Sequence, residues 1–217
     1  MLDNGSRRRA VDLPLLIVLE GLIFTVLFGG LSWLRREGLS IQFAGEALLL
    51  TGIATMLVWQ ASLAIHPILF LLILYLVTFR VRLLVDIANL FAQRGHFERA
   101  GRFYKLAASF WPDQAGKLIV QVNQATSQLQ QGSLDEAISG FKIILEHKGH
   151  SFLGIKYEVA AHYNLGVAYR RKKLDSLAIA EFNAVLDTWP ASEYARQANR
   201  ALEQVRKKEK VPPSENN

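Results

Sequence analysis

Residues 89–112 read NLFAQRGHFERAGRFYKLAASFWP, and this stretch decides the fold of the C-terminal half. Gly95 marks a turn, because glycine adopts backbone conformations that other residues avoid. Apolar residues recur at helical spacing on both sides of it, and Pro112 ends the second segment because proline cannot continue a helix. The stretch therefore predicts two short amphipathic helices joined by a tight turn.

The same pattern occurs twice more along the chain. Residues 132–137 read GSLDEA and repeat the turn, and residues 164–169 read NLGVAY and begin another pair, which closes at Pro190. Repetition of a helix–turn–helix unit at this length indicates stacked helical pairs that share one continuous core. A small residue follows each turn at an equivalent place: Ala100, Ala137 and Ala178.

These units resemble the tetratricopeptide repeat. Leu165, Gly166 and Tyr169 match the first-helix signature of that family, and the three alanines match the small residue where the two helices cross. The resemblance covers residues 81–192 and implies an all-α solenoid of three helix pairs, at about 81–114, 118–151 and 159–192. The crossing alanines lie 37 and 41 residues apart, against 34 in the family, so residues 114–117 and 150–158 look like insertions.

Residues 193–210 predict a further helix. Ala195, Ala198, Leu202 and Val205 form an apolar stripe at helical spacing, as a terminal capping helix requires. Residues 211–217 are expected to form a disordered tail.

The N-terminal half is apolar and is expected to cross a membrane. Residues 13–34 hold Glu20 as their only charged group and reach roughly 33 Å as a helix, which spans the hydrocarbon core. A secretory signal is the rival interpretation, but its apolar region is shorter and ends in small residues. Here the run ends in Trp33-Leu34 and two arginines, which favours an uncleaved span after a basic tail at residues 1–12.

Two further segments extend this transmembrane region to about residue 80. Residues 46–65 are long enough to span, and Pro67 opens a third segment, residues 67–85, that is expected to run into the first repeat. The third segment either spans the membrane or is a buried or interfacial helix. Three spans, or alternatively two, are therefore predicted.

Arginines set the expected orientation. With three spans, Arg35, Arg36, Arg80 and Arg82 share the side of the repeats; with two, residues 7–9 join Arg80 and Arg82 there. Either count places the repeats on the cytoplasmic side of an inner, plasma or thylakoid-like membrane.

Glu20 and Gln60 are the polar groups of interest within the membrane. An intramembrane carboxylate is costly unless it is neutral, paired or wet. It is either an ion or proton site, or a protonated group hydrogen-bonded to Gln60, Ser62 or Thr51. Gly21, Thr25 and Gly29 share one helix face, where small residues allow helices to approach closely.

The resemblance also implies a concave groove lined by the first helices, which in the family holds extended peptides or a partner's helix. Asparagines occupy matching places, but the basic residues of the family's carboxylate-binding subclass are missing. The candidate protein-binding residues are Asn89, Asn123, Tyr163, Asn164 and Arg170.

Several function classes find no support in the sequence. The chain has 217 residues and no cysteine, so disulfides and thiolate chemistry are excluded. Its net charge of +6 is spread out, which gives little support to nucleic-acid binding. We find no phosphate loop, metalloprotease motif or nucleophile elbow, and His147 and His150 lack a third metal ligand nearby. No catalytic residue, metal or cofactor is therefore expected.

The leading hypothesis is a non-enzymatic adaptor or assembly factor that holds protein partners at the membrane. In layout the chain resembles the anchored tetratricopeptide assembly factors of photosynthetic membranes. The alternative is an accessory subunit of a larger membrane complex, with the repeats as a docking arm. A small transporter or channel that uses Glu20 is a third hypothesis.

Overall fold

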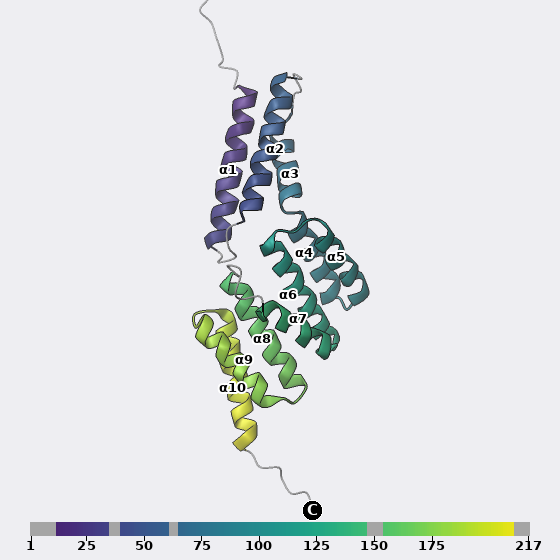
Figure 1. Ribbon diagram of the computed structural model, residues 1–217, viewed down its shortest axis with the longest axis vertical. Coiled ribbons are helices and arrows are strands. Elements are labelled where there is room, and N and C mark those ends of the chain that lie inside the picture. Colours follow the sequence, from purple (N-terminus) through teal and green to yellow (C-terminus); the bar gives the residue numbers. More distant parts are fainter. Residues whose placement is uncertain (1–11, 35–39, 61–64, 147–153, 211–217) are drawn as a thin grey trace, which may run out of the picture. The chain divides into compact units, whose positions relative to one another are not determined.

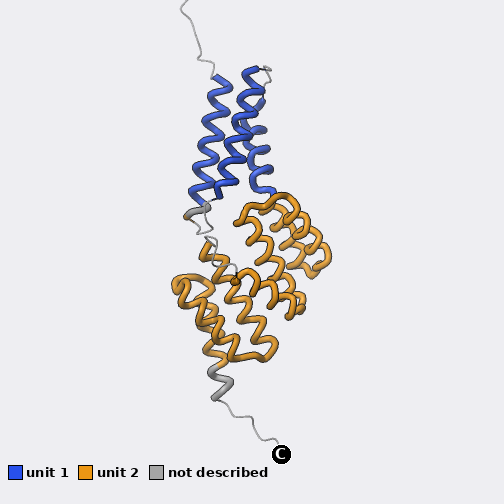
Figure 2. The backbone as a smooth tube through the Cα atoms, viewed as in Figure 1, with its two compact units in different colours: residues 1–33, 39–80 blue, residues 34–38, 81–217 orange. Residues whose placement is uncertain are grey.

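The computed structural model describes residues 12–34, 40–60, 65–146 and 154–210. These residues form ten helices and no strand, which confirms the predicted all-α class. They divide into two compact units (Figures 1 and 2): unit 1 holds the apolar helices up to Arg80, and unit 2 holds the helices from Val81 onward. The expected basic tail, the arginines at 35 and 36 and the tail at 211–217 lie outside the described residues.

Unit 1 contains α1 (Leu13–Leu34), α2 (Ile41–Gln60) and α3 (Pro67–Thr78). Ile17 and Leu74 are fully buried between these helices, whereas many large apolar side chains on the outer faces are exposed. An apolar surface of this kind is what a lipid environment requires. Two helices, α1 and α2, are long and apolar enough to cross a membrane, and a third span is obtained only if α3 and α4 are counted together.

The second helix begins five residues earlier than predicted, at Ile41. The sequence interpretation started the span at residue 46 because Glu46 precedes the uninterrupted apolar run. In the structure, both carboxylate oxygens of Glu46 accept hydrogen bonds from the Arg80 guanidinium, at 2.5 and 2.9 Å. A bidentate ion pair of this kind offsets the cost of a charge on an otherwise apolar helix.

Aromatic side chains from all three segments gather at one end of unit 1. The ring of Phe24 in α1 stacks on that of Phe43 in α2, and the ring of Phe79 lies 5.1 Å from Phe28 and 5.6 Å from Phe43. Tyr75 stacks on Phe79 at 4.9 Å. Edge-to-face and offset contacts at these distances are favourable, so this cluster joins the three segments beside the Glu46–Arg80 pair.

The third segment is not one helix through residue 85, as the sequence predicted. Helix α3 ends at Thr78, and Phe79 leaves the helical conformation with φ −97° and ψ 8°. Helix α4 (Arg80–Gln93) then begins a new element whose residues from Val81 onward belong to unit 2. The uncharged apolar run ends at Phe79, but the sequence interpretation extended the helix past Arg80 and Arg82 to reach spanning length.

Unit 2 consists of consecutive helix pairs followed by one more helix (Figure 1). The first pair is α4 and α5 (Phe97–Ser109), the second is α6 (Gln114–Gln131) and α7 (Leu134–Glu146), and the third is α8 (Ile155–Arg171) and α9 (Asp175–Thr188). Helix α6 contacts both α5 and α7, and α8 contacts α6, α7 and α9. This stacking is consistent with the predicted solenoid.

The second helices of the three pairs bury the same three positions. The crossing alanines are fully buried, and an aromatic ring follows each of them by one helical turn. In the third pair, a Cβ added to Gly166 would lie 2.7 Å from the Phe182 ring, so only glycine permits this approach of α8 to α9. The equivalent positions are Ala100, Tyr104 and Ala107, then Ala137, Phe141 and Ile144, then Ala178, Phe182 and Val185.

All three pairs also share one turn geometry. Gly95, Gly132 and Lys173 have φ of 78°, 93° and 61°, in the left-handed region. After each, a backbone N–H donates to the carbonyl five residues earlier, as from His96 to Phe91 and from Leu174 to Tyr169. This is the Schellman ending of a helix, which glycine favours. Lys173 therefore takes the place that glycine holds in the other two turns.

The residues 114–117 that look like an insertion in the sequence are helical. These residues form the first turn of α6, where the Asp113 carboxylate accepts a hydrogen bond from the Gly116 N–H at 2.6 Å. The extra length is an added helical turn with a proper N-cap. At the other end, α10 (Glu193–Lys210) closes the stack, and its predicted apolar stripe is buried: Ala195, Ala198, Leu202 and Val205.

Candidate functional site

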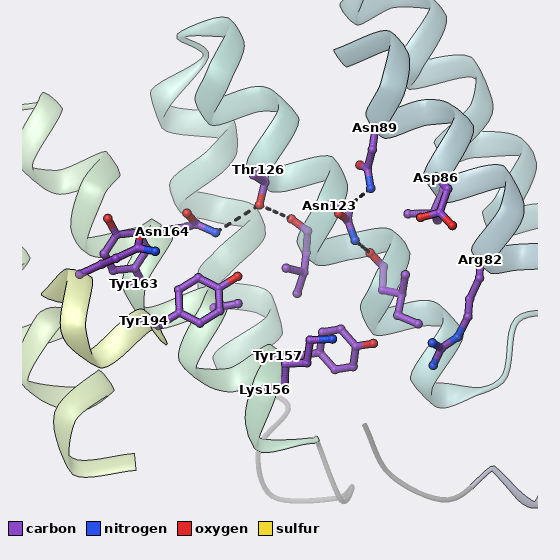
Figure 3. Close-up of a pocket in the computed structure, with 15 residues that line it drawn as sticks. Arg82, Asp86, Asn89, Asn123, Thr126, Lys156, Tyr157, Tyr163, Asn164 and Tyr194 are labelled. Atoms are coloured by element: carbon purple, nitrogen blue, oxygen red, sulfur yellow. Dashed lines mark hydrogen bonds between the residues drawn. The ribbon is translucent and has the colours of Figure 1, made fainter. Parts of the chain in front are cut away.

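A groove of about 590 Å³ crosses the first helices of unit 2 (Figure 3). Its walls come from α4, α6 and α8, and α10 closes one end with Tyr194 and Gln197. Its volume falls within the range of ligand-binding clefts. Of the predicted binding residues, four line this groove: Asn89, Asn123, Tyr163 and Asn164.

The register of the turns shows which lining residues are equivalent. Positions are counted back from the turn residue of each pair, which is Gly95, Gly132 or Lys173. On this count, Asn123 and Asn164 are equivalent to Asp86. The sequence interpretation paired Asn123 with Asn89 instead, because it applied the family's 34-residue spacing where the turns lie 37 residues apart. That pairing was displaced by about one helical turn.

The corrected register reveals a hydrogen bond that recurs between neighbouring pairs. The Asn89 side-chain amide donates to the Asn123 carbonyl oxygen at 3.0 Å, and the Asn164 amide donates to the Thr126 hydroxyl at 3.3 Å. Each bond joins the same two positions in consecutive first helices, and Figure 3 shows both in one row along the groove. We call Asn89, Asn123, Thr126 and Asn164 the polar row.

The polar row is anchored to the interior at its base. The buried Tyr104 hydroxyl donates to the Asn89 side-chain oxygen at 2.6 Å, and Asn123 donates to the Ile119 carbonyl at 2.7 Å. Burial raises the pKa of Tyr104 to about 12, so the phenol stays protonated as a donor. An amide has two donors and an oxygen with two lone pairs, so each asparagine retains capacity for a groove occupant.

Aromatic rings form the other part of the wall. The Tyr163 ring lies 5.6 Å from that of Tyr194 and 5.8 Å from that of Phe182, so it is held between α9 and α10. Burial, and then the neighbouring Tyr163, raise the pKa of Tyr194. The Tyr194 phenol is thus neutral at physiological pH, and both tyrosines present an apolar ring with a polar tip.

Two basic residues line the groove that sequence reasoning did not place there. Arg82 was assigned to the end of a membrane span, and Lys156 falls within the apparent insertion at residues 150–158. Figure 3 shows Arg82 on α4 and Lys156 on α8, and Asp86 follows Arg82 by about one helical turn. The sequence does indicate that Arg82 belongs to the groove, because the register of the turns aligns it with Ile119 and Ala160, which also line the groove.

Arg170 does not line the groove. Its guanidinium donates to the Gln204 side-chain oxygen of α10 at 3.0 Å, at an exposed position. The next two residues contact the neighbouring pair: Arg171 donates to the Leu129 carbonyl at 2.7 Å, and Lys172 pairs with Asp135. The run therefore joins helix ends within unit 2.

His162 is buried on α8 and contacts Glu181 of α9. Its Nδ1 lies 2.6 Å from a Glu181 carboxylate oxygen, and its Nε2 has no hydrogen-bond partner among the described residues. The pair lies between the two helices of one repeat, where it fixes their packing, and neither residue lines the groove.

The structure does not join Glu20 to Gln60. Gln60 is exposed, and one oxygen of Glu20 is buried without a hydrogen-bond partner among the described residues. Thr51 donates instead to the Ala47 carbonyl at 2.7 Å, and Ser62 lies outside the described residues. Of the predicted small-residue face, Gly21 packs directly on Thr51, whereas a Cβ at Gly29 would meet no described atom within 4 Å.

Within the described ranges, no three His, Asp or Glu side chains are grouped as a metal site would require, and His147 and His150 fall outside those ranges. In a comparison with known families, the tetratricopeptide repeat model matches residues 122–193. The match runs from α6 to the start of α10, and the α4–α5 pair before it repeats the same turn and buried positions. No curated protein and no solved structure matches the chain.

Proposed function

We propose that this chain, which carries tetratricopeptide repeats, is a non-enzymatic scaffold or assembly factor that holds an extended segment of a protein partner at a membrane. Repeats of this family act in protein–protein interaction and are generally non-enzymatic. The observation that carries the proposal is the polar row, which presents side-chain amides at regular intervals along the groove.

The chemistry of the groove suits an extended backbone. A peptide in that conformation presents alternating N–H and C=O groups, and asparagine amides can both donate to and accept from them. Tyr163 and Tyr194 offer ring surface to apolar side chains beside that backbone. Because the amides are already held by Tyr104 and Ile119, little side-chain entropy is lost when a segment binds.

The membrane part of the proposal rests on unit 1. Helices α1 and α2 meet the length and composition of spans, and their outer faces expose large apolar side chains such as Leu49 and Trp59. Under this proposal unit 1 anchors the repeats and unit 2 binds the partner. Alkaline extraction of membranes is expected to leave the chain in the pellet; release into the supernatant would contradict an integral anchor.

Point variants test the groove. Asn164→Ala removes one amide of the polar row, and loss of such a hydrogen bond in an interface costs about 1–2 kcal/mol, or roughly a fivefold to thirtyfold loss of affinity. Partner recovery from mild detergent extracts should fall by that factor. Asn183→Ala, an exposed asparagine on α9, and Arg170→Ala, outside the groove, are the matched controls. Equal recovery with all three variants would refute the groove as the binding site.

A further inference from the structure

We propose that the groove of unit 2 binds a proline-rich segment of its partner in the polyproline II conformation, in preference to a β-strand. This inference rests on the proposed function, because it names the kind of protein segment that the same groove holds. Three observations carry it: the spacing of the polar row, the hydrogen-bond donors that the row has left, and the tyrosines that line the groove with it.

The polar row repeats once for each pair of neighbouring first helices. One hydrogen bond joins α4 to α6 through Asn89 and Asn123, and the equivalent bond joins α6 to α8 through Thr126 and Asn164. Packed helices lie about 8–10 Å apart, so the two bonds recur along the groove at roughly that distance. An occupant that runs along the row therefore meets an equivalent set of polar groups at each such interval.

The repeat of a polyproline II helix fits this interval. It has about three residues per turn and rises about 3.1 Å per residue, so every third residue faces the same way at a spacing of about 9 Å. In a β-strand every second residue faces the same way, at about 6.8 Å, and an α-helix has a pitch of about 5.4 Å. Of these conformations, polyproline II is the one whose repeat stays in step with the first helices of the groove.

Each side-chain amide of the polar row retains a hydrogen-bond donor. Asn89, Asn123 and Asn164 each use one N–H in a bond inside unit 2, which leaves one N–H on each for an occupant. The Thr126 hydroxyl donates to the Val122 carbonyl at 2.7 Å, so its own donor is already used. A proline-rich backbone presents carbonyl groups but few N–H groups, because proline has none. The remaining amide N–H groups can bond those carbonyls.

Tyrosine side chains supply the ring surface on which proline docks. Tyr157, Tyr163 and Tyr194 line the groove together with the polar row (Figure 3), and they are three of the six tyrosines in the chain, so tyrosine is concentrated here. The rings of Tyr163 and Tyr194 lie 5.6 Å apart at an interplanar angle of 47°, so they form an angled surface instead of a flat stack. Proline-rich segments dock in aromatic-lined grooves, and their preformed conformation loses little entropy on binding.

Synthetic peptides test the conformation of the occupant. Each is a nonapeptide with blocked ends and a fluorescent label, and its binding to the full-length chain in mild detergent is followed by fluorescence anisotropy. The first peptide repeats leucine–proline–proline, which places its leucines on the polyproline II interval. The second repeats leucine–alanine–alanine, which keeps the spacing of the leucines but removes proline. The third alternates leucine and proline, which keeps proline but changes the spacing.

We expect the first peptide to bind roughly tenfold more tightly than the other two, because its conformation is preformed and in step with the groove. Asn164→Ala should weaken its binding about fivefold, through loss of one hydrogen bond. Asn164→Asp should weaken it at least as much, because the carboxylate keeps the size of the side chain but has no N–H to donate to a carbonyl. Asn183→Ala, at an exposed asparagine of α9, is the matched control and should leave binding unchanged.

The comparison among the peptides needs no variant, so it does not depend on how a substitution affects folding. Absence of binding, or equal affinity for the first two peptides, would overturn the polyproline II conformation, and equal affinity for the first and third would overturn the match of spacing. Binding of the first peptide that both Asn164 variants leave unchanged would place it outside the groove and overturn the inference. The proposed function would still stand if Asn164→Ala lowered recovery of the native partner, and it would fall as well if that recovery were unchanged.

Discussion

Replacing Gly166 with alanine tests the packing on which the repeat assignment depends. The added Cβ would lie 2.7, 2.9 and 3.1 Å from three atoms of the Phe182 ring. Carbon atoms in contact prefer 3.5–4.0 Å, so the ring or the helix must move by roughly 0.5–1 Å. Phe182 is fully buried, so its ring has no open space to enter. Overpacking of this kind costs about 1–3 kcal/mol.

Helix propensity acts in the opposite direction. Alanine favours a helix interior over glycine by about 1 kcal/mol, so the net destabilisation expected for Gly166→Ala is about 1 kcal/mol. Gly101→Ala is the matched control, because Gly101 is also helical and an added Cβ there meets no described atom within 4 Å. The control should stabilise α5 by about 0.5–1 kcal/mol. The two identical substitutions should therefore have opposite signs.

Hydrogen–deuterium exchange of the full chain in detergent micelles measures both effects locally. Amides of α8 should exchange about fivefold faster in Gly166→Ala, and those of α5 somewhat more slowly in Gly101→Ala. In a Phe182→Leu background the penalty of Gly166→Ala should vanish, since residues in contact show non-additive effects. If Gly166→Ala slowed exchange in α8 as Gly101→Ala does in α5, the described contact of α8 with α9 would be wrong.

Three further predictions follow from single contacts. Lys173→Gly should stabilise the third turn by about 0.5–1 kcal/mol, because it removes a lysine from the left-handed region. The reverse change, Gly132→Lys, should destabilise the second turn. Chemical denaturation measures both effects. Tyr104 has a folded-state pKa of about 12 against about 10 when unfolded, so its contribution to the free energy of unfolding is complete below pH 10 and is lost as the pH rises from 10 to 12. Tyr104→Phe should therefore flatten the dependence of stability on pH in that window. An unchanged curve would contradict the buried donor. Gly21→Ala should loosen the contact of α1 with α2, since its Cβ would lie 2.1 Å from the Thr51 hydroxyl oxygen. Gly52→Ala should not, because a Cβ there meets no described atom within 4 Å. The yield of cross-linking between cysteines placed on α1 and α2 compares the two variants.

Much of the fold could be predicted from local patterns. The turn glycines, the crossing alanines and the apolar stripe of α10 each reflect a backbone or packing requirement that one residue type satisfies, and these positions are buried or left-handed as expected. The third turn was recognised in spite of Lys173, because the buried positions around it kept their spacing. The break at Phe79 was missed, because the aromatic contacts and the ion pair around residues 79 and 80 join segments that are distant in sequence.

The candidate site was predicted in part, for a physical reason. The resemblance to the repeat family implies a groove along the first helices, so Asn89, Asn123, Tyr163 and Asn164 could be named from it. Their partners could not, because the hydrogen bonds of the polar row depend on the register between helices, which the added turn at residues 114–117 shifts. Arg170 was misplaced because it lies at the helix end, where α10, absent from the repeat pattern, contacts it.

The central claim, that the groove of unit 2 holds a protein segment at the membrane, has one direct test. A photo-cross-linking amino acid replaces Tyr163 in the groove or, as the control, Asn183 on the exposed face of α9, in full-length chain expressed in native membranes. The account predicts a discrete cross-linked protein from position 163, absent from position 183 and reduced about tenfold by Asn123→Ala. Equal adducts from both positions, or none from position 163 in intact membranes, would contradict it.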